Sequence, residues 1–225
     1  MAVKNVKQKN FEHVYILNVP CVYASVIEPK KKLHEPAPDA KNQSKREYAI
    51  TVFVDDADRE TLEDEILINK ELKKVGVEKN KKRRIKFPVK DEDGNETAFT
   101  PYKGLNGIQL SLNELTNAGK LANLNVLKRT EDGKTEPFTE LVGNGSIVSI
   151  KLFAYRNQED LLNVALDTIV VEKHVPYEGG SGGVVHDDVL GIDIDLNANK
   201  KSEPEAEQEA KATPAGDDFD DDVDF

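Results

Sequence analysis

The residues best placed to do chemistry lie in the segment SIVSIKLFAYRN at 146–157. One set of alternate positions is apolar, and the other set is Lys151, Phe153 and Tyr155. In a β-strand successive side chains point to opposite faces, so a cation and two rings would share one surface. Rings stack on nucleobases and lysines contact phosphates, so the pattern predicts contact with a single-stranded nucleic acid. The alternative is that both rings pack beneath a loop or a helix, as aromatic residues in strands often do.

A second candidate is the basic run KNKKRRIKFPVK at 79–90, which is followed by the turn-like DEDGNE and by TAFTPYKG. This order predicts a basic β-hairpin arm that carries Phe87 and other rings. Interleaved rings and cations suit a groove for single strands, because they need no dedicated readers of base edges. The alternative is a solvated lysine-rich loop or a strand edge protected by charge. The residues assigned here to nucleic-acid contact are Lys81, Lys82, Arg83, Arg84, Lys86, Phe99, Tyr102 and Lys103.

A third candidate is the C-terminal DDFDDDVDF at 217–225. Its six aspartates repel one another, and its two phenylalanines have no core to enter, which is typical of a disordered segment that binds a partner. The aspartates imitate a phosphate backbone, so we expect the tail to compete for the basic groove at an effective concentration on the order of mM. When released, Phe225 and its α-carboxylate would dock in an apolar pocket with a basic rim. The tail residues are Asp217, Asp218, Phe219, Asp220, Asp221, Asp222, Asp224 and Phe225.

Catalytic and metal chemistry find little support in the sequence. The histidines at 13, 34, 174 and 186 are scattered, and Cys21 is the single cysteine, so neither a zinc motif nor a nucleophile with its base is evident. The glycine turn GNGS at 143–146 precedes a strand rather than a helix, which argues against a phosphate loop. We therefore predict a protein that is not an enzyme and that holds no cofactor and no metal.

The scaffold that must position these residues is predicted from the periodicity. The β-branched segment at 11–28 carries Pro20, which predicts a long or broken strand with an edge or bulge at the proline, and a basic loop at 29–46 follows it. Further strands are expected at 47–56, with even positions facing the core, and at 107–113, 123–130, 146–157 and 164–175. The one strong helix is expected at 59–76, capped by Asp56 or Asp58 and ended by Gly76. Short strands with one inserted helix predict a small β-barrel rather than an α/β sheet.

Charge divides the chain into a body and a tail. The formal net charge of the 225 residues is -11, which by itself discourages a nucleic-acid function. However, residues 1–176 hold 28 basic and 27 acidic side chains, whereas residues 177–225 hold 3 and 15. We therefore predict a domain at 1–177 and a flexible linker with a disordered acidic tail at 178–225. The absence of an apolar run of about 18 residues or of a signal peptide predicts a cytoplasmic protein without membrane association.

Several sequence blocks, in this order, resemble the phage single-stranded DNA-binding proteins of the replication-fork type. The blocks are EYAITVFVDDADRETLEDEI at 47–66, NLNVLKRTEDGK at 123–134, GNGS leading into SIVSIKLFAYRN, VALDTIVVEKHVPYEGG at 164–180, and the terminal DDFDDDVDF. The chain departs from relatives in having no tryptophan, and the basic arm has no clear counterpart.

The resemblance implies a mainly β fold with a single OB-fold, a five-stranded Greek-key barrel with one inserted α-helix, to which this chain adds a basic hairpin. It implies that Lys151, Phe153, Tyr155 and Arg156 lie on or beside the DNA-binding sheet and that partners recognise Phe225. It also implies a protein of the infected bacterial cell that coats single-stranded DNA during replication, recombination and repair. Whether the protein is a monomer or a dimer stays open. Its tail would recruit the phage polymerase, the helicase-primase or recombination proteins.

Two other function classes stay open at this point. The chain could be an acidic-tailed interaction protein, a chaperone or DNA mimic that binds basic proteins and does not bind DNA. It could also be a strand-annealing recombinase that forms an oligomeric ring, although such proteins are usually more helical than this sequence predicts.

Overall fold

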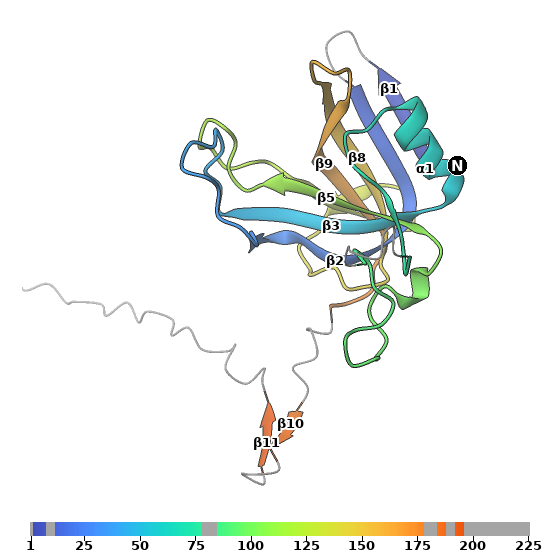
Figure 1. The fold of residues 1–225 in the computed structure, drawn as a ribbon, viewed down its shortest axis with the longest axis vertical. Coiled ribbons are helices and arrows are strands. Elements are labelled where there is room, and N and C mark those ends of the chain that lie inside the picture. Colours follow the sequence, from blue (N-terminus) through green and yellow to red (C-terminus); the bar gives the residue numbers. More distant parts are fainter. Residues whose placement is uncertain (1, 8–11, 78–84, 178–183, 188–191, 196–225) are drawn as a thin grey trace, which may run out of the picture. The chain divides into compact units, whose positions relative to one another are not determined.

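The structure, a computed structural model, describes residues 2–7, 12–77, 85–177, 184–187 and 192–195. The chain forms two units, Met1–Glu178 and Gly179–Phe225. Strands dominate the first unit, which confirms the prediction of a mainly β chain (Figure 1). Its strands are β1 (Val3–Lys7), β2 (Glu12–Lys31), β3 (Arg46–Val54), β4 (Lys73–Lys74), β5 (Asn106–Asn113), β6 (Asn125–Arg129), β7 (Thr135–Pro137), β8 (Ile147–Arg156) and β9 (Leu162–Lys173).

These strands form one mixed sheet in the order β4-β5-β3-β2-β8-β9-β6-β7, and β1 pairs with β2. Among the described strands, β6 and β9 are parallel and the other neighbours are antiparallel. The long strand β2 pairs with a different strand along each half of its length. Its residues Glu12–Pro20 pair with β8, and its residues Cys21–Lys31 pair with β3. A register shift lies between Ile16 and Val19, where Asn18 has a φ of 53°. The strand is therefore long and unbroken, and this bulge lies before Pro20 rather than at it, because Pro20 itself pairs with Ile147.

The core fills the inside of this curved sheet. On β8 the buried positions are Val148, Ile150, Leu152 and Ala154, so the predicted alternation is confirmed. On β5, Ile108 and Leu110 are buried in the same way.

Strand β3 differs, because both of its faces are covered. Ile50, Val52 and Val54 face the main core, whereas Phe53 belongs to a second cluster on the outer side.

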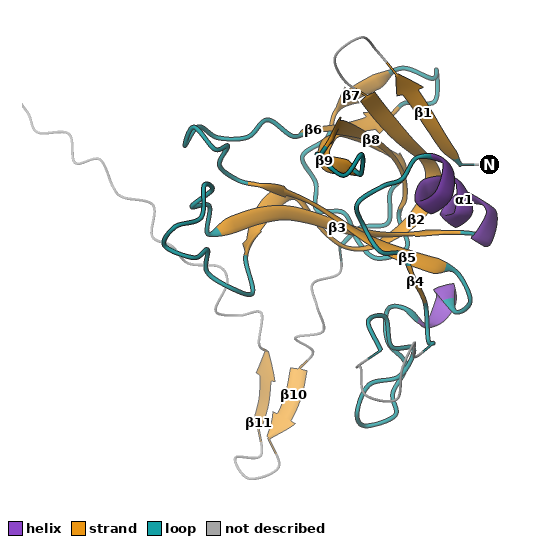
Figure 2. Ribbon diagram, turned by 45° about the horizontal axis from the view of Figure 1, so that its top comes forward, coloured by secondary structure: helices purple, strands orange, loops and turns teal. Residues whose placement is uncertain are grey.

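The second cluster is built by the irregular segment 85–105, which follows β4 and includes the short 3₁₀ helix η2 (Thr100–Tyr102) (Figure 2). Phe87 is 3% exposed and packs with Val22, Phe53 and Val75. The prediction that this ring is displayed on a hairpin arm is therefore wrong: burying a ring against an apolar sheet face is more favourable than exposing it. A short turn does occur, since Lys90 bridges to Glu96, but the basic residues 78–84 lie outside the described part.

The predicted helix at 59–76 is much shorter in the structure. Helix α1 (Asp56–Glu60) continues as one π-helical stretch, η1 (Thr61–Glu65), and then ends. The chain turns at Leu67, whose φ is 59°, and Ile68 forms a parallel bridge with Leu162 of β9. Ile66, Ile68 and Leu72 are buried whereas Leu67 is exposed, so this segment extends over the core as irregular chain instead of forming a helical stripe.

The cap of this helix also differs from the prediction. Asp55 is the N-cap, and its carboxylate accepts a hydrogen bond of 2.8 Å from the backbone N–H of Asp58. The side chain of Asp58 instead accepts hydrogen bonds from the backbone N–H groups of Ala2 and Val3, at distances from 2.9 to 3.2 Å. These bonds hold the start of β1 beside α1 (Figure 1).

In the second unit, β10 (Val184–Asp187) and β11 (Ile192–Asp195) form an antiparallel hairpin. A flexible linker and a disordered tail were predicted for all of 178–225, whereas the structure has two paired strands within this range. Valine and isoleucine are frequent in strands, and each strand of the hairpin contains two of them. The acidic terminus 217–225 lies outside the described residues. Among those described, no helix is long and apolar enough to cross a membrane.

Candidate nucleic-acid interface

Two adjoining hollows lie on the outer face of β3 and β5. One has a volume of about 310 Å³ and the other about 200 Å³. Lys86 and Gln109 line both of them, so the two hollows form one depression, which we name the β3–β5 groove. The groove is positioned by strand alternation, because Gln109 is exposed between the buried Ile108 and Leu110. Its functional side chains are Tyr23, Lys30, Glu47, Lys70, Lys86, Phe99, Gln109 and Ser111.

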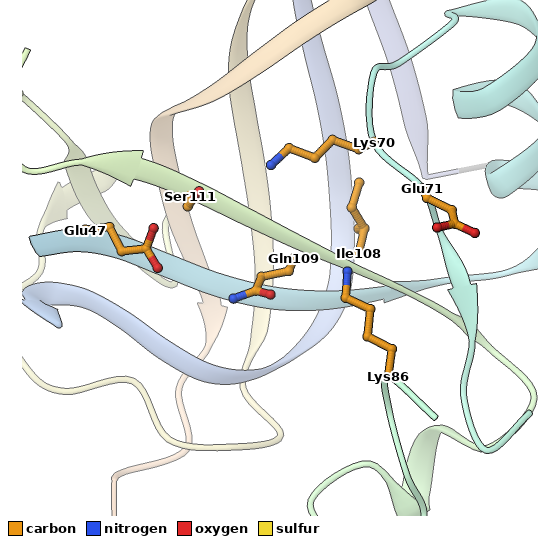
Figure 3. A pocket seen from close by; sticks show the side chains of 7 residues that line it. All are labelled: Glu47, Lys70, Glu71, Lys86, Ile108, Gln109 and Ser111. Carbon is orange, nitrogen blue, oxygen red and sulfur yellow. The ribbon is translucent and has the colours of Figure 1, made fainter. Parts of the chain in front are cut away.

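The polar end of the groove is lined by two lysines and two glutamates (Figure 3). Lys70 and Lys86 reach it from different segments, and Gln109 and Ser111 of β5 lie at its floor. Burial lowers the pKa of Lys70, and the carboxylate of Glu47 partly opposes this effect. The pKa of Lys86 is also lowered, first by burial and then by repulsion from Lys73 and Lys70. The charged forms of both lysines are therefore less favourable in the groove than in water. An anion bound in the groove would favour these charged forms.

The availability of these charges decides what the groove can bind. Lys30, Lys70 and Lys86 form no ion pair in the part of the chain that the structure describes. No described carboxylate oxygen lies within 4.0 Å of their ammonium nitrogens. Glu47 and Glu71 line the same hollow, but Glu71 pairs with Lys73 at 3.2 Å. The three ammonium groups can therefore contact phosphates without first breaking an ion pair with a described carboxylate, although the ammonium of Lys86 lies over the Phe87 ring, 5.4 Å from its centroid.

The other end of the groove is aromatic. Tyr23 is 53% exposed, and its ring meets the edge of Phe99 with centroids 5.4 Å apart. Its φ of 50° places it out of the regular alternation of β2, and its backbone N–H donates a hydrogen bond of 2.9 Å to Oδ1 of Asn144. Phe99 is half-buried and packs in turn on Phe53. Tyr23 thus offers an open ring face at a fixed position, as base stacking requires.

The outer face of β8 is a second aromatic surface. His13, Phe153 and Ala165 lie side by side across β2, β8 and β9, and His13 meets Phe153 with centroids 6.2 Å apart. Phe153 is 42% exposed and Tyr155 is 58% exposed, so the predicted alternation is right and the alternative of buried rings is wrong. We name this surface the β8 strip; its members are His13, Tyr15, Lys151, Phe153 and Tyr155.

The cations of the β8 strip are paired. Lys151 forms an ion pair of 2.9 Å with Asp167, and the hydrogen bond between them raises the pKa of Lys151. Beside the strip, Arg156 pairs with Glu12 at 2.8 Å and donates a hydrogen bond to the backbone carbonyl of Asp160. The bond to Glu12 raises the pKa of Arg156. Both cations are therefore held in ion pairs within the fold, and a ligand would have to break or share these ion pairs to bind them.

The structure separates the predicted site residues into several places. Lys86 and Phe99 lie in the β3–β5 groove, and Lys151, Phe153, Tyr155 and Arg156 lie on or beside the β8 strip. Tyr102 stacks on Phe53 with centroids 4.3 Å apart and planes 13° apart, and burial raises its pKa. Lys103 is exposed at the end of η2. Lys81, Lys82, Arg83 and Arg84 lie outside the described residues, as do the tail residues from Asp217 to Phe225.

Six of the eight groove residues were not predicted from the sequence: Tyr23, Lys30, Glu47, Lys70, Gln109 and Ser111. They come from β2, from β3, from the segment after η1 and from β5, and only the fold brings them together. One signal was present: β3 has apolar or small residues on both faces, which indicates that another segment covers its outer face. Among the described residues, no group of three His, Cys, Asp or Glu side chains could hold a metal ion.

Comparison with known proteins gives no family model and no curated relative that matches the sequence. Among solved structures, the single-stranded DNA-binding protein from bacteriophage Enc34 is 19% identical, with a TM-score of 0.40 over 84% of this chain and 99% of that chain. The same protein in complex with single-stranded DNA gives 16% and 0.39, over 79% and 98% of the two chains. The single-stranded DNA-binding protein gp2.5 of bacteriophage T7 gives 14% and 0.42, over 76% and 91%.

The chain resembles phage single-stranded DNA-binding proteins. The identities are below 20% and the TM-scores are below 0.5. The function of this chain is therefore inferred from its own residues.

Proposed function

We propose that this chain binds single-stranded DNA, with little sequence preference, in the β3–β5 groove. The observation that carries the proposal is one depression that combines an exposed tyrosine ring with three ammonium groups that form no ion pair with any described residue. Lysines neutralise the phosphates that every nucleotide carries, and a ring stacks on any base. Neither contact reads a base edge, so the expected binding tolerates many sequences.

The arrangement of strands supports a barrel of the OB type. β2, β3 and β5 are consecutive antiparallel neighbours, and β8 returns to lie beside β2, which gives the order fourth-first-second-third of a Greek key. In an OB-fold the second and third strands present the face that binds oligonucleotides. Here those strands are β3 and β5, on whose outer face the groove lies. We assign this domain to residues 1–177 and the linker and tail to 178–225.

The proposal extends to the segments that flank the groove along the chain. Lys86, which lines the groove, directly follows Arg83, Arg84 and Ile85, so the basic run from Lys81 to Arg84 supplies further phosphate contacts. The acidic tail, with its six aspartates between Asp217 and Asp224, competes with DNA for the same cations. Phe225 then serves as the contact for phage replication or recombination proteins in the infected cell. The protein acts by binding and protecting DNA rather than by catalysis.

Fluorescence anisotropy with a labelled oligo-dT tests the proposal. We expect binding that weakens steeply with salt, because each neutralised phosphate releases counterions. Deleting residues 217–225 should tighten binding at low salt by removing the competitor. If neither the full chain nor the deletion variant binds, the alternative of an acidic-tailed interaction protein is favoured. If both bind equally well, DNA binding stands and self-competition is wrong.

A further inference from the structure

The polar hollow of the groove holds two amines, and neither forms an ion pair with a carboxylate of the described residues, although Glu47 and Glu71 also line the hollow. Lys70 comes from the irregular chain after η1, and Lys86 comes from the segment that covers β3 (Figure 3). The volume of about 310 Å³ is ample for a small anion such as a phosphate monoester. The open mouth lets such a ligand enter from solvent, since Lys86 and Gln109 are exposed.

The lining suits a phosphate group in particular. Two ammonium groups supply charge, and the amide of Gln109 and the hydroxyl of Ser111 can donate hydrogen bonds to further oxygens. A phosphate bound to Lys70 would lie beside Lys86 within the same hollow. A reactive group attached to that phosphate would therefore be held close to the amine of Lys86.

Lys86 is the more accessible amine of the two, because it is exposed whereas Lys70 is half-buried. Glu47 favours the charged form of Lys70, whereas two cations, Lys73 and Lys70, act on Lys86 in addition to its burial. A lysine that is partly desolvated and next to other cations is neutral more often than an ordinary lysine, and the neutral amine is the nucleophile. The cluster thus combines an anchor for an anion with an activated amine.

We propose that the hollow binds small acyl phosphates and that Lys86 is acylated there, with Lys70 as the positioning residue. The neutral Nζ of Lys86 attacks the carbonyl carbon of the acyl phosphate. A C–N bond forms, the C–O bond to the phosphate breaks, and inorganic phosphate leaves. The surplus proton on nitrogen passes to the departing phosphate or to water, so that the product is an amide and hydrogen phosphate.

The consequence concerns regulation of the same groove and rests on the proposed function. An amide at Lys86 carries no charge, so acylation removes one of the three lysine cations that line the groove. Single-stranded DNA would then bind more weakly and with a smaller dependence on salt. DNA already in the groove would also protect Lys86 from acylation.

Mass spectrometry of individual lysines tests the proposal on the full chain. The protein is incubated with acetyl phosphate or with N-acetoxysuccinimide, an acetyl donor that has no phosphate, and the labelling rate of Lys86 is compared with that of the exposed Lys4. We expect acetyl phosphate to label Lys86 roughly tenfold faster than Lys4, because the hollow holds the reagent beside the amine. Lys70→Gln should lower labelling of Lys86 by acetyl phosphate several-fold more than labelling by N-acetoxysuccinimide.

Each outcome decides the proposal. Equal rates for Lys86 and Lys4 with acetyl phosphate would overturn it, and so would an equal effect of Lys70→Gln on the two reagents, because docking of the phosphate would then be absent. Binding of oligo-dT by unlabelled protein is measured separately. A chain that binds DNA but labels without selectivity refutes the acylation site alone, whereas selective labelling without DNA binding refutes the proposed function and leaves the site.

Discussion

The β3–β5 groove and the β8 strip both present rings and cations on the outer side of the same sheet, yet they differ in what their charges are free to do. Lys70 and Lys86 lie in the groove without an ion pair in the described part of the chain, whereas Lys151 is held by Asp167. An ion pair at a surface must be broken or shared before its cation can neutralise a phosphate. The difference teaches that a cation in a strand pattern is a binding residue only when the fold leaves it unpaired.

The largest effect is expected from removing the free charges of the groove. The double variant Lys70→Gln/Lys86→Gln should weaken oligo-dT binding by roughly 3–6 kcal/mol at low salt, because hydrogen bonds to charged groups contribute about 1.5–3 kcal/mol each. The slope of log K against log salt should fall by about 1.4, since each phosphate contact with a single strand contributes about 0.7. Titrations by anisotropy at several salt concentrations measure both quantities.

Lys151→Gln is the matched control for this variant, because it removes one cation from the β8 strip. We expect a change in affinity below about 0.5 kcal/mol, which is within the range of an exposed ion pair. A loss at Lys151 as large as that of the double variant would move the DNA from the groove to the strip.

The next effect concerns the rings. Tyr23→Ala should cost about 1–3 kcal/mol of DNA binding, the range for loss of one stacked base, without loss of fold because the side chain is 53% exposed. Tyr155→Ala removes an equally exposed tyrosine from the strip and should leave the affinity nearly unchanged. Quenching of tyrosine fluorescence by oligo-dT gives a second readout. Equal losses for the two variants would show that both surfaces bind the strand.

A smaller effect is expected where the groove depends on close packing. A Cβ added at Gly107 of β5 would lie 2.5 Å from Cε2 of Phe87, so Gly107→Ala must displace that ring. We expect a loss of roughly 1–3 kcal/mol in the free energy of unfolding, the usual cost of overpacking. DNA affinity should also fall, because Lys86 is the neighbour of Phe87. Urea denaturation and anisotropy together show whether the second cluster supports the groove.

The smallest effect tests the structural role of Arg156. Burial tends to raise the pKa of Glu12, but the hydrogen bonds from Arg156 and Asn5 outweigh it, so the pKa is lowered from 4.5. A lowered pKa in the folded state stabilises the protein above the ordinary pKa of Glu12 and ceases to do so as the pH falls through the lowered value. Arg156→Gln should therefore reduce the free energy of unfolding by about 1 kcal/mol at neutral pH, and by progressively less below pH of about 4.

This last prediction also separates folding from binding. At a temperature where Arg156→Gln is fully folded, its affinity for oligo-dT should match that of the unchanged chain. A loss of affinity without a loss of stability would show that Arg156 contacts DNA directly, as the resemblance to the phage proteins implied.

The sequence predicted those features that depend on local periodicity. Alternation was enough to place Phe153 and Tyr155 outside and Leu152 inside, because the side chains of a strand alternate whatever the partner strands are. The predicted helix failed beyond Glu65 because the residues after it are buried over the core by contacts with β9, which helical spacing does not reveal.

The groove could not be predicted from the periodicity of the sequence, because it depends on contacts between segments that are far apart along the chain. Tyr23, Lys70 and Gln109 meet only when β2, β5 and the chain after η1 are folded together. Pairing of Lys151 with Asp167 is equally remote from the sequence, since it depends on the register between β8 and β9. Residue types indicated the chemistry correctly, whereas the choice of surface needed the fold.

Photo-crosslinking of oligo-dT that carries 5-iodouracil tests most directly whether the strand lies in the groove. Irradiation joins the modified base to an aromatic ring in stacking contact, and mass spectrometry identifies the residue. The account predicts crosslinks at Tyr23 or Phe99, whose ring centroids lie 5.4 Å apart at the aromatic end of the β3–β5 groove. Crosslinks confined to Phe153 and Tyr155 would contradict it and would place the DNA on the β8 strip.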